Sequence, residues 1–239
     1  MKIINIGSIN IDHVYSVNNI VKPGQTISSD KYNVYQGGKG ANQSIALARA
    51  GVKVFHGGKI GNDGLWVLDN LKDSGVDISN IIQSKEPTGH AIIQVEKTGE
   101  NSIVLYGGCN KSISKGDIDS MLSSFTKNDI LLLQNEVNNL EYIIKSAYDR
   151  GIKIYFNPAP FTEDIKNYSL NLLDVIVVNE TEAMDLSGVD KIEEVKEALL
   201  KKYPYIKVLL TLGAKGVNYF DKDCDIEVDA LKADVVDTT

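Results

Sequence analysis

Residues Gly37-Gly38-Lys39-Gly40-Ala41-Asn42 form the most informative stretch of this 239-residue chain. Glycines surround a single lysine, and the stretch opens onto a segment whose apolar residues predict a helix. Glycine permits positive φ angles and lets a ligand approach the backbone closely. The first turn of a helix also leaves backbone N–H groups unpaired. The stretch is therefore typical of a turn that holds a polar ligand, although by itself it is equally consistent with a simple packing turn.

The two common phosphate-binding motifs do not fit this stretch. A P-loop requires Ser or Thr directly after the lysine, but Gly40 follows Lys39. A dinucleotide fingerprint requires a third glycine where this chain has Gln43. The absence of that fingerprint argues against a nicotinamide-dependent dehydrogenase.

Composition and charge exclude several classes of partner. The formal net charge is −7, which argues against nucleic acid. No apolar run approaches the roughly 18–20 residues that cross a bilayer, and the first residues are typical of a buried strand rather than of a secretory signal. Cys109 and Cys224 lie far apart without metal-ligand spacing, which indicates reduced thiols. We therefore expect a cytoplasmic protein with no membrane or nucleic-acid partner.

The positions of the two arginines bear on the charge of the substrate. Arg49 and Arg150 each lie near the end of a predicted helix, just before Gly51 or Gly151, where a cation favours the helix dipole. Neither is placed to bind a phosphorylated substrate bidentately. This weakly favours a neutral substrate.

Apolar strands alternate with amphipathic helices along most of the chain, which predicts an α/β fold with a mostly parallel central sheet and helices on both faces. The continuous apolar runs typical of strands buried on both faces are 129–133, 152–156, 174–178 and 205–210. Segments 11–36 and 88–106 differ, because their alternating residues predict antiparallel strands. We expect them to form a small β lid on a single domain covering residues 1–239.

Polar residues follow the predicted strands at the ends where ligands bind in open parallel sheets. Each position has a structural alternative; for example, Asn179 and Glu182 have the spacing of a helix capping box. It is their common placement that predicts a shared site. The residues are Asn10 and Asp12, Gln134 to Glu136, Asn157 to Pro160, Asn179 to Glu182, and Thr211 to Gly216.

These residue types favour binding of a polyol together with a nucleotide. Asp and Asn side chains suit hydroxyl groups. A carboxylate such as Glu182 suits a hydrated Mg²⁺, which often takes only one or two protein carboxylates. Gly213 and Gly216 allow close approach of phosphates or a base.

The motifs together resemble the ribokinase family of sugar kinases, the phosphofructokinase B type, and within that family they are most similar to the ribokinases. They follow the family's order over nearly the whole chain: Gly7-Ser8-Ile9-Asn10-Ile11-Asp12, Gly37 to Gln43, Asn157-Pro158-Ala159-Pro160, Asn179 to Ala183, and Thr211-Leu212-Gly213 with Gly216. The resemblance implies a ribokinase-like fold with a lid that often also forms a dimer contact.

The resemblance also assigns roles to individual residues. The implied sugar-binding residues are Asn10, Asp12, Gly38, Lys39, Asn42 and Glu136. The implied nucleotide-site residues are Asn179, Thr211, Gly213 and Gly216, with Glu182 supporting Mg²⁺ through water. Asp237 and Thr239 match positions that bind a monovalent cation such as K⁺.

The sequence departs from the family pattern at Asp237-Thr238-Thr239, which begins a motif whose Gly-Ala-Gly-Asp portion is not present. The family's catalytic base, an aspartate, would lie beyond Thr239. We therefore assign no catalytic residue and expect residues 1–239 alone to be nearly inactive, because losing a positioned base costs roughly 10²–10⁴ in rate.

The expected activity is ATP-dependent phosphorylation of a primary hydroxyl of a neutral sugar, with ribose the first choice, using ATP and Mg²⁺, with K⁺ as a further candidate cofactor. A kinase for fructose, adenosine or pseudouridine is the alternative within the family. A sugar-binding fragment without catalysis is the alternative outside it. We also expect a homodimer formed through the lid.

Overall fold

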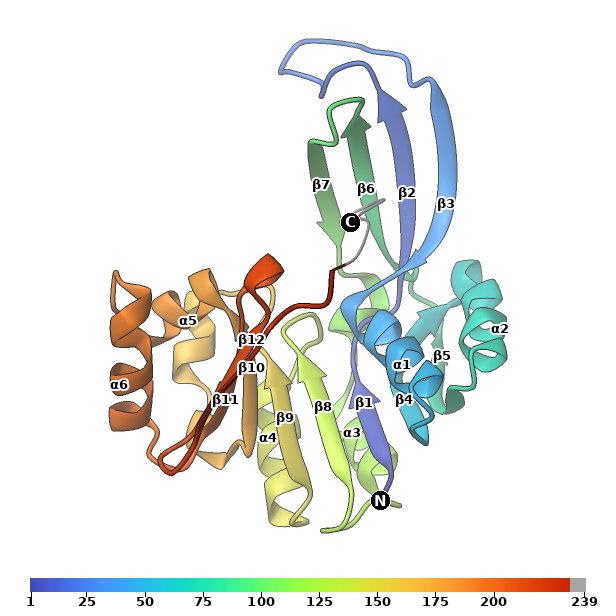
Figure 1. Ribbon diagram of the computed structural model, residues 1–239. Coiled ribbons are helices and arrows are strands. Elements are labelled where there is room, and N and C mark those ends of the chain that lie inside the picture. The colour runs from blue at the N-terminus through green and yellow to red at the C-terminus, as the bar shows by residue number, and fades with distance from the viewer. Residues whose placement is uncertain (233–239) are drawn as a thin grey trace.

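The computed structural model of the chain describes residues 1–232. A large, mostly parallel sheet carries helices on both faces, and a smaller sheet projects from one end of it (Figure 1). This arrangement confirms the predicted α/β fold class.

The large sheet has nine strands in the order β13-β12-β11-β10-β9-β8-β1-β4-β5. The strands from β5 to β11 run parallel, and β12 and β13 add an antiparallel hairpin at one edge. Their bounds are β1 Ile3–Ile6, β4 Val54–Gly61, β5 Asp77–Ser84, β8 Ile130–Gln134, β9 Lys153–Asn157, β10 Val175–Asn179, β11 Lys207–Thr211, β12 Val217–Phe220 and β13 Asp225–Val228.

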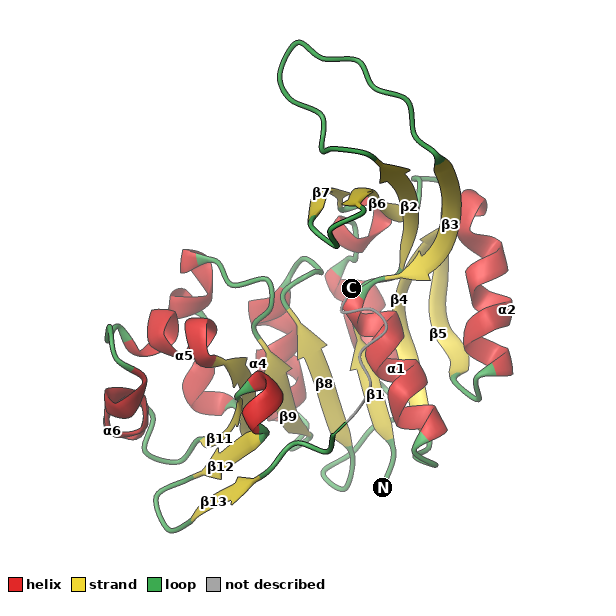
Figure 2. Cartoon of the chain, turned by 45° about the horizontal axis from the view of Figure 1, so that its top comes forward, coloured by secondary structure: helices red, strands yellow, loops and turns green. Residues whose placement is uncertain are grey.

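The central strands are apolar because helices cover both of their faces. Helices α1 and α2 pack on one face with Ile3 and Val54 of the sheet, while the remaining helices pack on the other face with Ile4 and Leu131 (Figure 2). The helix bounds are α1 Lys39–Arg49, α2 Leu65–Asp73, α3 Lys115–Leu122, α4 Leu140–Asp149, α5 Glu180–Ser187 and α6 Ile192–Lys202. Single 3₁₀ turns are η1 Asn62–Gly64, η2 Gly108–Lys111, η3 Glu163–Asn167, η4 Leu170–Leu172 and η5 Gly213–Lys215.

Helix α4 illustrates how the sequence pattern sets the packing. Leu140, Ile143, Ile144 and Ala147 are all buried, as their helical spacing predicts. The chain then turns at Gly151, whose φ of 69° suits glycine. Arg150 caps this helix and donates to the Ser146 carbonyl and the Asp119 carboxylate, so it is engaged in structure.

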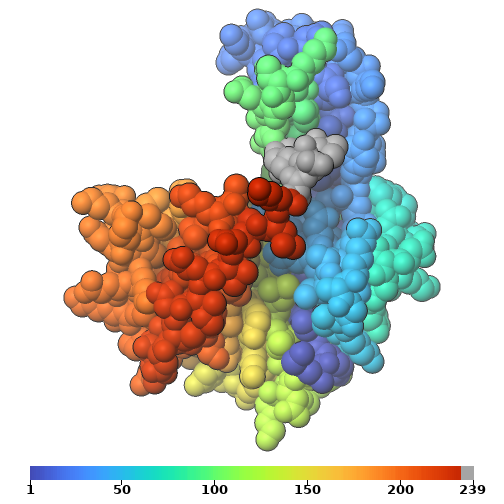
Figure 3. Space-filling model, in the orientation of Figure 1, coloured from blue at the N-terminus to red at the C-terminus, as the bar shows by residue number. Residues whose placement is uncertain are grey.

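The smaller sheet forms the lid and has the strand order β3-β2-β6-β7. Its strands are β2 Asn10–Val17, β3 Lys31–Gly37, β6 Gly89–Glu96 and β7 Asn101–Tyr106. The pairs β2–β3 and β6–β7 are antiparallel, as expected, but β2 and β6 pair in parallel and join them. The lid stands clear of the main body (Figure 3).

The described residues bear on two further expectations. No helix within residues 1–232 has the length and apolar character to cross a bilayer. Cys109 is buried and Cys224 is partly exposed, and both are free thiols.

Candidate functional site

The candidate site lies at the edge of the large sheet where the parallel strands end, below the lid. The strand registers place Gln134 beside Asn157, and Asn179 beside Thr211. The ends of β1, β8, β9, β10 and β11 therefore share one rim, as the sequence predicted.

The glycine-rich turn crosses the end of β1 in close contact. Gly38 has a φ of 94°, and a Cβ there would lie 2.7 Å from the Ser8 carbonyl oxygen, so only glycine fits without strain. The Ala41 amide donates to that same carbonyl at 2.9 Å. The Gly40 amide donates to the Ser8 hydroxyl at 3.3 Å. The first turn of α1 is thus fastened to the residues that follow β1.

Glu136 is the centre of the polar cluster. Its side chain is 6% exposed and pairs with the Lys39 ammonium at 2.8 Å, while the Lys39 backbone amide donates to the second carboxylate oxygen at 3.1 Å. The Ser8 hydroxyl donates to that second oxygen as well. Because a buried carboxylate is costly unless it is paired, these donors hold Glu136 in place.

Asp12 approaches the same cluster from the lid strand β2. Burial raises the pKa of the Asp12 carboxyl, the Glu136 charge raises it further, and His13 and Lys39 act in the opposite direction. A Cβ at Gly37 would overlap the Asp12 carboxylate, so the glycine leaves room for it. Asp12 of the lid and Glu136 of the rim therefore place two carboxylates near the Lys39 ammonium.

Asn10 occupies the junction between the main sheet and the lid. It is 4% exposed, and its side-chain oxygen accepts a hydrogen bond from Asn110 at 2.8 Å. Asn110 also pairs with both backbone groups of Ile9, at 3.0 and 3.1 Å. The amide nitrogen of Asn10 remains a donor that can face a ligand.

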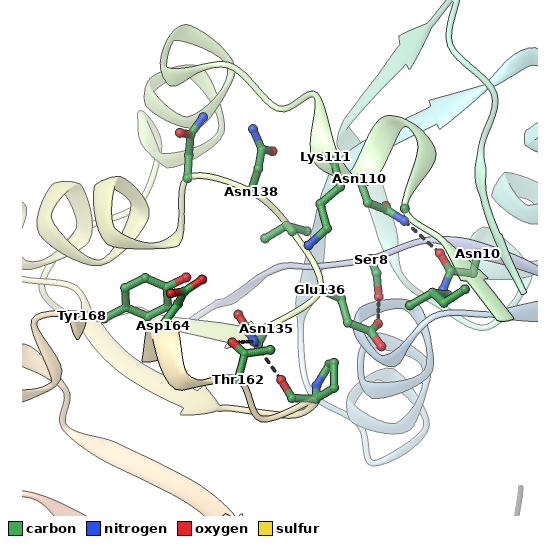
Figure 4. Close-up of a pocket in the computed structure, with 15 residues that line it drawn as sticks. Ser8, Asn10, Asn110, Lys111, Asn135, Glu136, Asn138, Thr162, Asp164 and Tyr168 are labelled. Atoms are coloured by element: carbon green, nitrogen blue, oxygen red, sulfur yellow. Dashed lines mark hydrogen bonds between the residues drawn. The ribbon is translucent and has the colours of Figure 1, made fainter. Parts of the chain in front are cut away.

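A hollow of about 450 Å³ opens beside this cluster. Ser8, Asn10 and Glu136 line one side of it, and Asp164 and Tyr168 line the far side (Figure 4). Its volume lies in the range of small-molecule sites, and its walls are rich in amides and hydroxyls. Such a surface suits a polyhydroxylated ligand.

The proposed nucleotide-site residues lie farther along the same rim. Asn179 caps α5, with its side chain accepting from the Glu182 amide at 2.8 Å and the Glu182 carboxylate accepting from the Asn179 amide at 3.0 Å. The predicted capping box is therefore present. Thr211 lies next to Asn179, and its hydroxyl donates to the Val178 carbonyl at 3.3 Å.

The two glycines after β11 have different local requirements. Gly213 has a φ of 56° and open space around its α-carbon, which leaves its backbone accessible. Gly216 has a φ of 107°, and a Cβ there would collide with the backbone at Val228. The fold itself therefore requires Gly216, whether or not a nucleotide lies near it.

One predicted site residue lies apart from this cluster, and two others are not described. Asn42 is exposed and borders a groove between α1 and α2 with Gln36 and Arg49. Asp237 and Thr239 lie outside the described residues. Among residues 1–232 no group of three or more His, Cys, Asp or Glu residues could hold a metal ion.

Sequence reasoning assigned no role to Ser8 or Asn110, although both organise the site. Ser8 lies within the Gly7 to Asp12 motif, and that motif was the available signal. Asn110 carried no signal, because its partners Ile9 and Asn10 are about a hundred positions away.

Comparison with known proteins places the chain among carbohydrate kinases. The profile of the pfkB family of carbohydrate kinases matches residues 1–239. The chain is 39% identical over 243 residues to the ribokinase of Haemophilus influenzae, covering 98% of this chain and 79% of that protein. It is 31% identical over 251 residues to the deoxyribokinase of Salmonella typhi, covering 100% of this chain and 81% of that protein. The structure of Arabidopsis thaliana ribokinase complexed with ribose and ATP superimposes with a TM-score of 0.84 at 28% identity, covering 98% of this chain and 80% of that one.

Proposed function

The chain belongs to the pfkB family of carbohydrate kinases, and we propose that it serves ATP-dependent transfer of a phosphoryl group to the primary hydroxyl of ribose. The observation that carries this proposal is the cluster of Asn10, Asp12, Lys39 and Glu136 between the lid and the rim. Its carboxylates accept hydrogen bonds from sugar hydroxyls, while the ammonium and the amide donate to them.

The cluster suits a neutral sugar better than a phosphorylated one. The Lys39 ammonium is already paired with Glu136, and the second carboxylate, Asp12, adds further negative charge. A phosphate dianion placed beside Asp12 and Glu136 would face two carboxylates, and the Lys39 ammonium there is already paired. A sugar hydroxyl meets no such repulsion.

We assign the nucleotide to the neighbouring part of the rim at Asn179, Thr211 and Gly213. The accessible backbone at Gly213 suits close approach of a phosphate or base. Glu182 would support Mg²⁺ through water, since one oxygen of its carboxylate accepts from the Asn179 amide and the other has no hydrogen bond within residues 1–232. When bound, Mg²⁺ neutralises the charge on the transferring phosphoryl group. K⁺ remains part of the proposal, at Asp237 and Thr239.

A cytoplasmic location also remains part of the proposal. The free thiols of Cys109 and Cys224 support it, because a reducing compartment keeps thiols unpaired.

We further propose that two copies of the chain associate through their lids. The strand registers place apolar side chains on the lid face opposite Asp12, where Val34 and Ile92 pair with His13, and Val104 pairs with Ile92. Val34, Ile92 and Val104 are 41%, 43% and 65% exposed. Apolar surface of this kind is typical of an interaction site, and a second copy of the same face would cover it.

Equilibrium binding tests the proposed function without relying on the catalytic aspartate that the resemblance places after Thr239. Calorimetry of the chain with ribose, deoxyribose, fructose and adenosine should show the tightest binding for ribose. Tighter binding of adenosine or fructose would redirect the assignment within the family. No binding of any of them, by a chain that still binds ATP with Mg²⁺, would overturn the proposal of a sugar kinase.

A further inference from the structure

Buried polar side chains lie directly beneath the sugar-binding turn, and the proposed function uses none of them. Asn5 of β1, Ser44 of α1, His56 of β4 and Gln134 of β8 are each 0% exposed. Burial of polar groups costs free energy unless they are hydrogen-bonded. Their arrangement therefore requires a structural or functional reason.

The side chains form one continuous hydrogen-bonded chain. The Asn5 amide nitrogen donates to the Gly40 carbonyl at 2.7 Å and to the Ser44 hydroxyl at 2.9 Å. The Ser44 hydroxyl oxygen lies 2.8 Å from Nδ1 of His56. From the other side, the Gln134 amide nitrogen donates to the Asn5 side-chain oxygen at 3.0 Å. The Gly40 carbonyl can only accept, so it settles which end of the Asn5 amide is nitrogen.

One direction of donation satisfies every member of this hydrogen-bonded chain from Asn5 to His56. Because the Ser44 oxygen accepts from Asn5, its own proton is free to be donated to Nδ1 of His56. We assign this direction, in which Nδ1 is unprotonated and the single proton of the neutral ring resides on Nε2. Nε2 faces the Gly7 carbonyl in a weak contact that does not reach full hydrogen-bond geometry. A Cβ on Gly58 would lie 2.9 Å from the Gly7 carbonyl oxygen and 3.4 Å from Nε2, so glycine leaves room for this contact.

The two ends of this hydrogen-bonded series of side chains contact the backbone at Gly7 and Gly40, next to residues of the proposed sugar site. Gly7 directly precedes Ser8, and Gly40 directly follows Lys39. The two glycines are in contact, since a Cβ on Gly7 would lie 2.7 Å from the Gly40 α-carbon. A displacement of either backbone would therefore change the spacing between Asn10 and Lys39.

We propose that His56, acting through Ser44 and Asn5, is a positioning residue that sets the first turn of α1 against the end of β1 for sugar binding. This inference rests on the proposed function for its ligand. A neutral imidazole has one acceptor nitrogen and one donor nitrogen. In His56 the acceptor, Nδ1, faces Ser44 of α1, and the donor, Nε2, faces the Gly7 carbonyl after β1. An aliphatic residue of similar size would fill the space but hold neither segment.

The test compares His56→Leu with His56→Gln by calorimetry with ribose and with an ATP analogue at neutral pH. Glutamine offers an acceptor oxygen toward Ser44 and a donor nitrogen toward Gly7, so it should restore what leucine removes. We expect His56→Leu to bind ribose about tenfold more weakly, within the range of couplings between residues in contact. His56→Gln should bind within about threefold of the unaltered chain, and nucleotide affinity should stay constant throughout.

A core variant far from the turn separates positioning from general loss of stability. Leu199 of α6 is fully buried on the opposite side of the sheet from α1, and Leu199→Ala should lower stability while leaving ribose affinity unchanged. Equal ribose affinity in His56→Leu and the unaltered chain would overturn the inference. So would an equal loss of affinity in Leu199→Ala.

Amide hydrogen exchange provides an outcome that does not depend on the sugar. His56→Leu should speed exchange in residues 40–44 more than in α6, and His56→Gln should reverse the effect. If the unaltered chain binds no ribose, the proposed function fails, and the exchange pattern alone decides whether His56 positions the turn. Uniform acceleration over the whole chain would refute positioning.

Discussion

Lowering the pH should destabilise this protein through His56 in a defined window. Burial lowers the pKa of His56 from its ordinary value of 6.5 to about 4, against a weaker opposing effect of the Gly7 backbone. Between these two values the unfolded chain therefore holds more protons on this residue than the folded chain does. The free energy of unfolding then rises with pH. The contribution is fully present above pH 6.5 and is lost as the pH falls toward 4.

The magnitude follows from the size of the change in pKa. At 1.36 kcal/mol for each pH unit, a fall from 6.5 to about 4 corresponds to roughly 3 kcal/mol of stability. The residue is completely buried, so solvent screening does not reduce this figure.

The assay is urea unfolding at several pH values between 7 and 4, on the unaltered chain and on His56→Gln. Carboxylates titrate in the same window in both proteins, so their effects cancel in the difference. Glutamine keeps the hydrogen-bonding pattern but cannot be protonated. The stability of the unaltered chain relative to His56→Gln should therefore fall by about 3 kcal/mol as the pH decreases. A difference that stays constant within about 0.5 kcal/mol, the usual additivity error, would refute the reasoning.

Further predictions concern the sugar cluster and the lid. Glu136→Gln removes the partner of Lys39, and calorimetry should show ribose binding weakened by about 2–3 kcal/mol, because a charged hydrogen-bond acceptor is lost; binding within about twofold of the unaltered chain would contradict the role of Glu136. Asn110→Ala releases Asn10, and ribose affinity should fall by about 1 kcal/mol with nucleotide affinity unchanged; an equal loss for both ligands would indicate a general effect. Val104→Glu places a charge on the exposed lid face, and light scattering coupled to gel filtration should show a dimer becoming a monomer; an unaltered mass would place any dimer contact elsewhere.

Patterns local to one element were reliable guides to structure. The apolar runs became strands, the spacing around Ile143 and Ile144 became the buried face of α4, and the turn after residue 96 became the β6–β7 hairpin. The capping box of Asn179 and Glu182 was also predictable, because its two residues are three positions apart. Each of these features depends on contacts between near neighbours, which periodicity and spacing record directly.

Contacts between distant segments were not predictable in the same way. Ser8 meets Glu136 and Asn5 meets Gln134 only because β8 is placed beside β1 in the sheet. Strand order depends on how the crossover helices pack, and the alternation of strands and helices along the sequence does not reveal that order. The parallel pairing of β2 with β6 in the lid was missed for the same reason.

The amino-acid sequence by itself determined the family, the parallel sheet, and the kinds of side chain that gather at the strand ends. The sequence directly shows a glycine at position 38, where φ is positive, and the carboxamides and carboxylates that follow the buried strands. Only the tertiary structure decided that Glu136 pairs with Lys39, and that His56 lies beneath the turn as a buried, neutral ring. The physical reason is that desolvation and hydrogen-bond direction depend on which groups surround an atom, and folding brings those groups from remote parts of the chain.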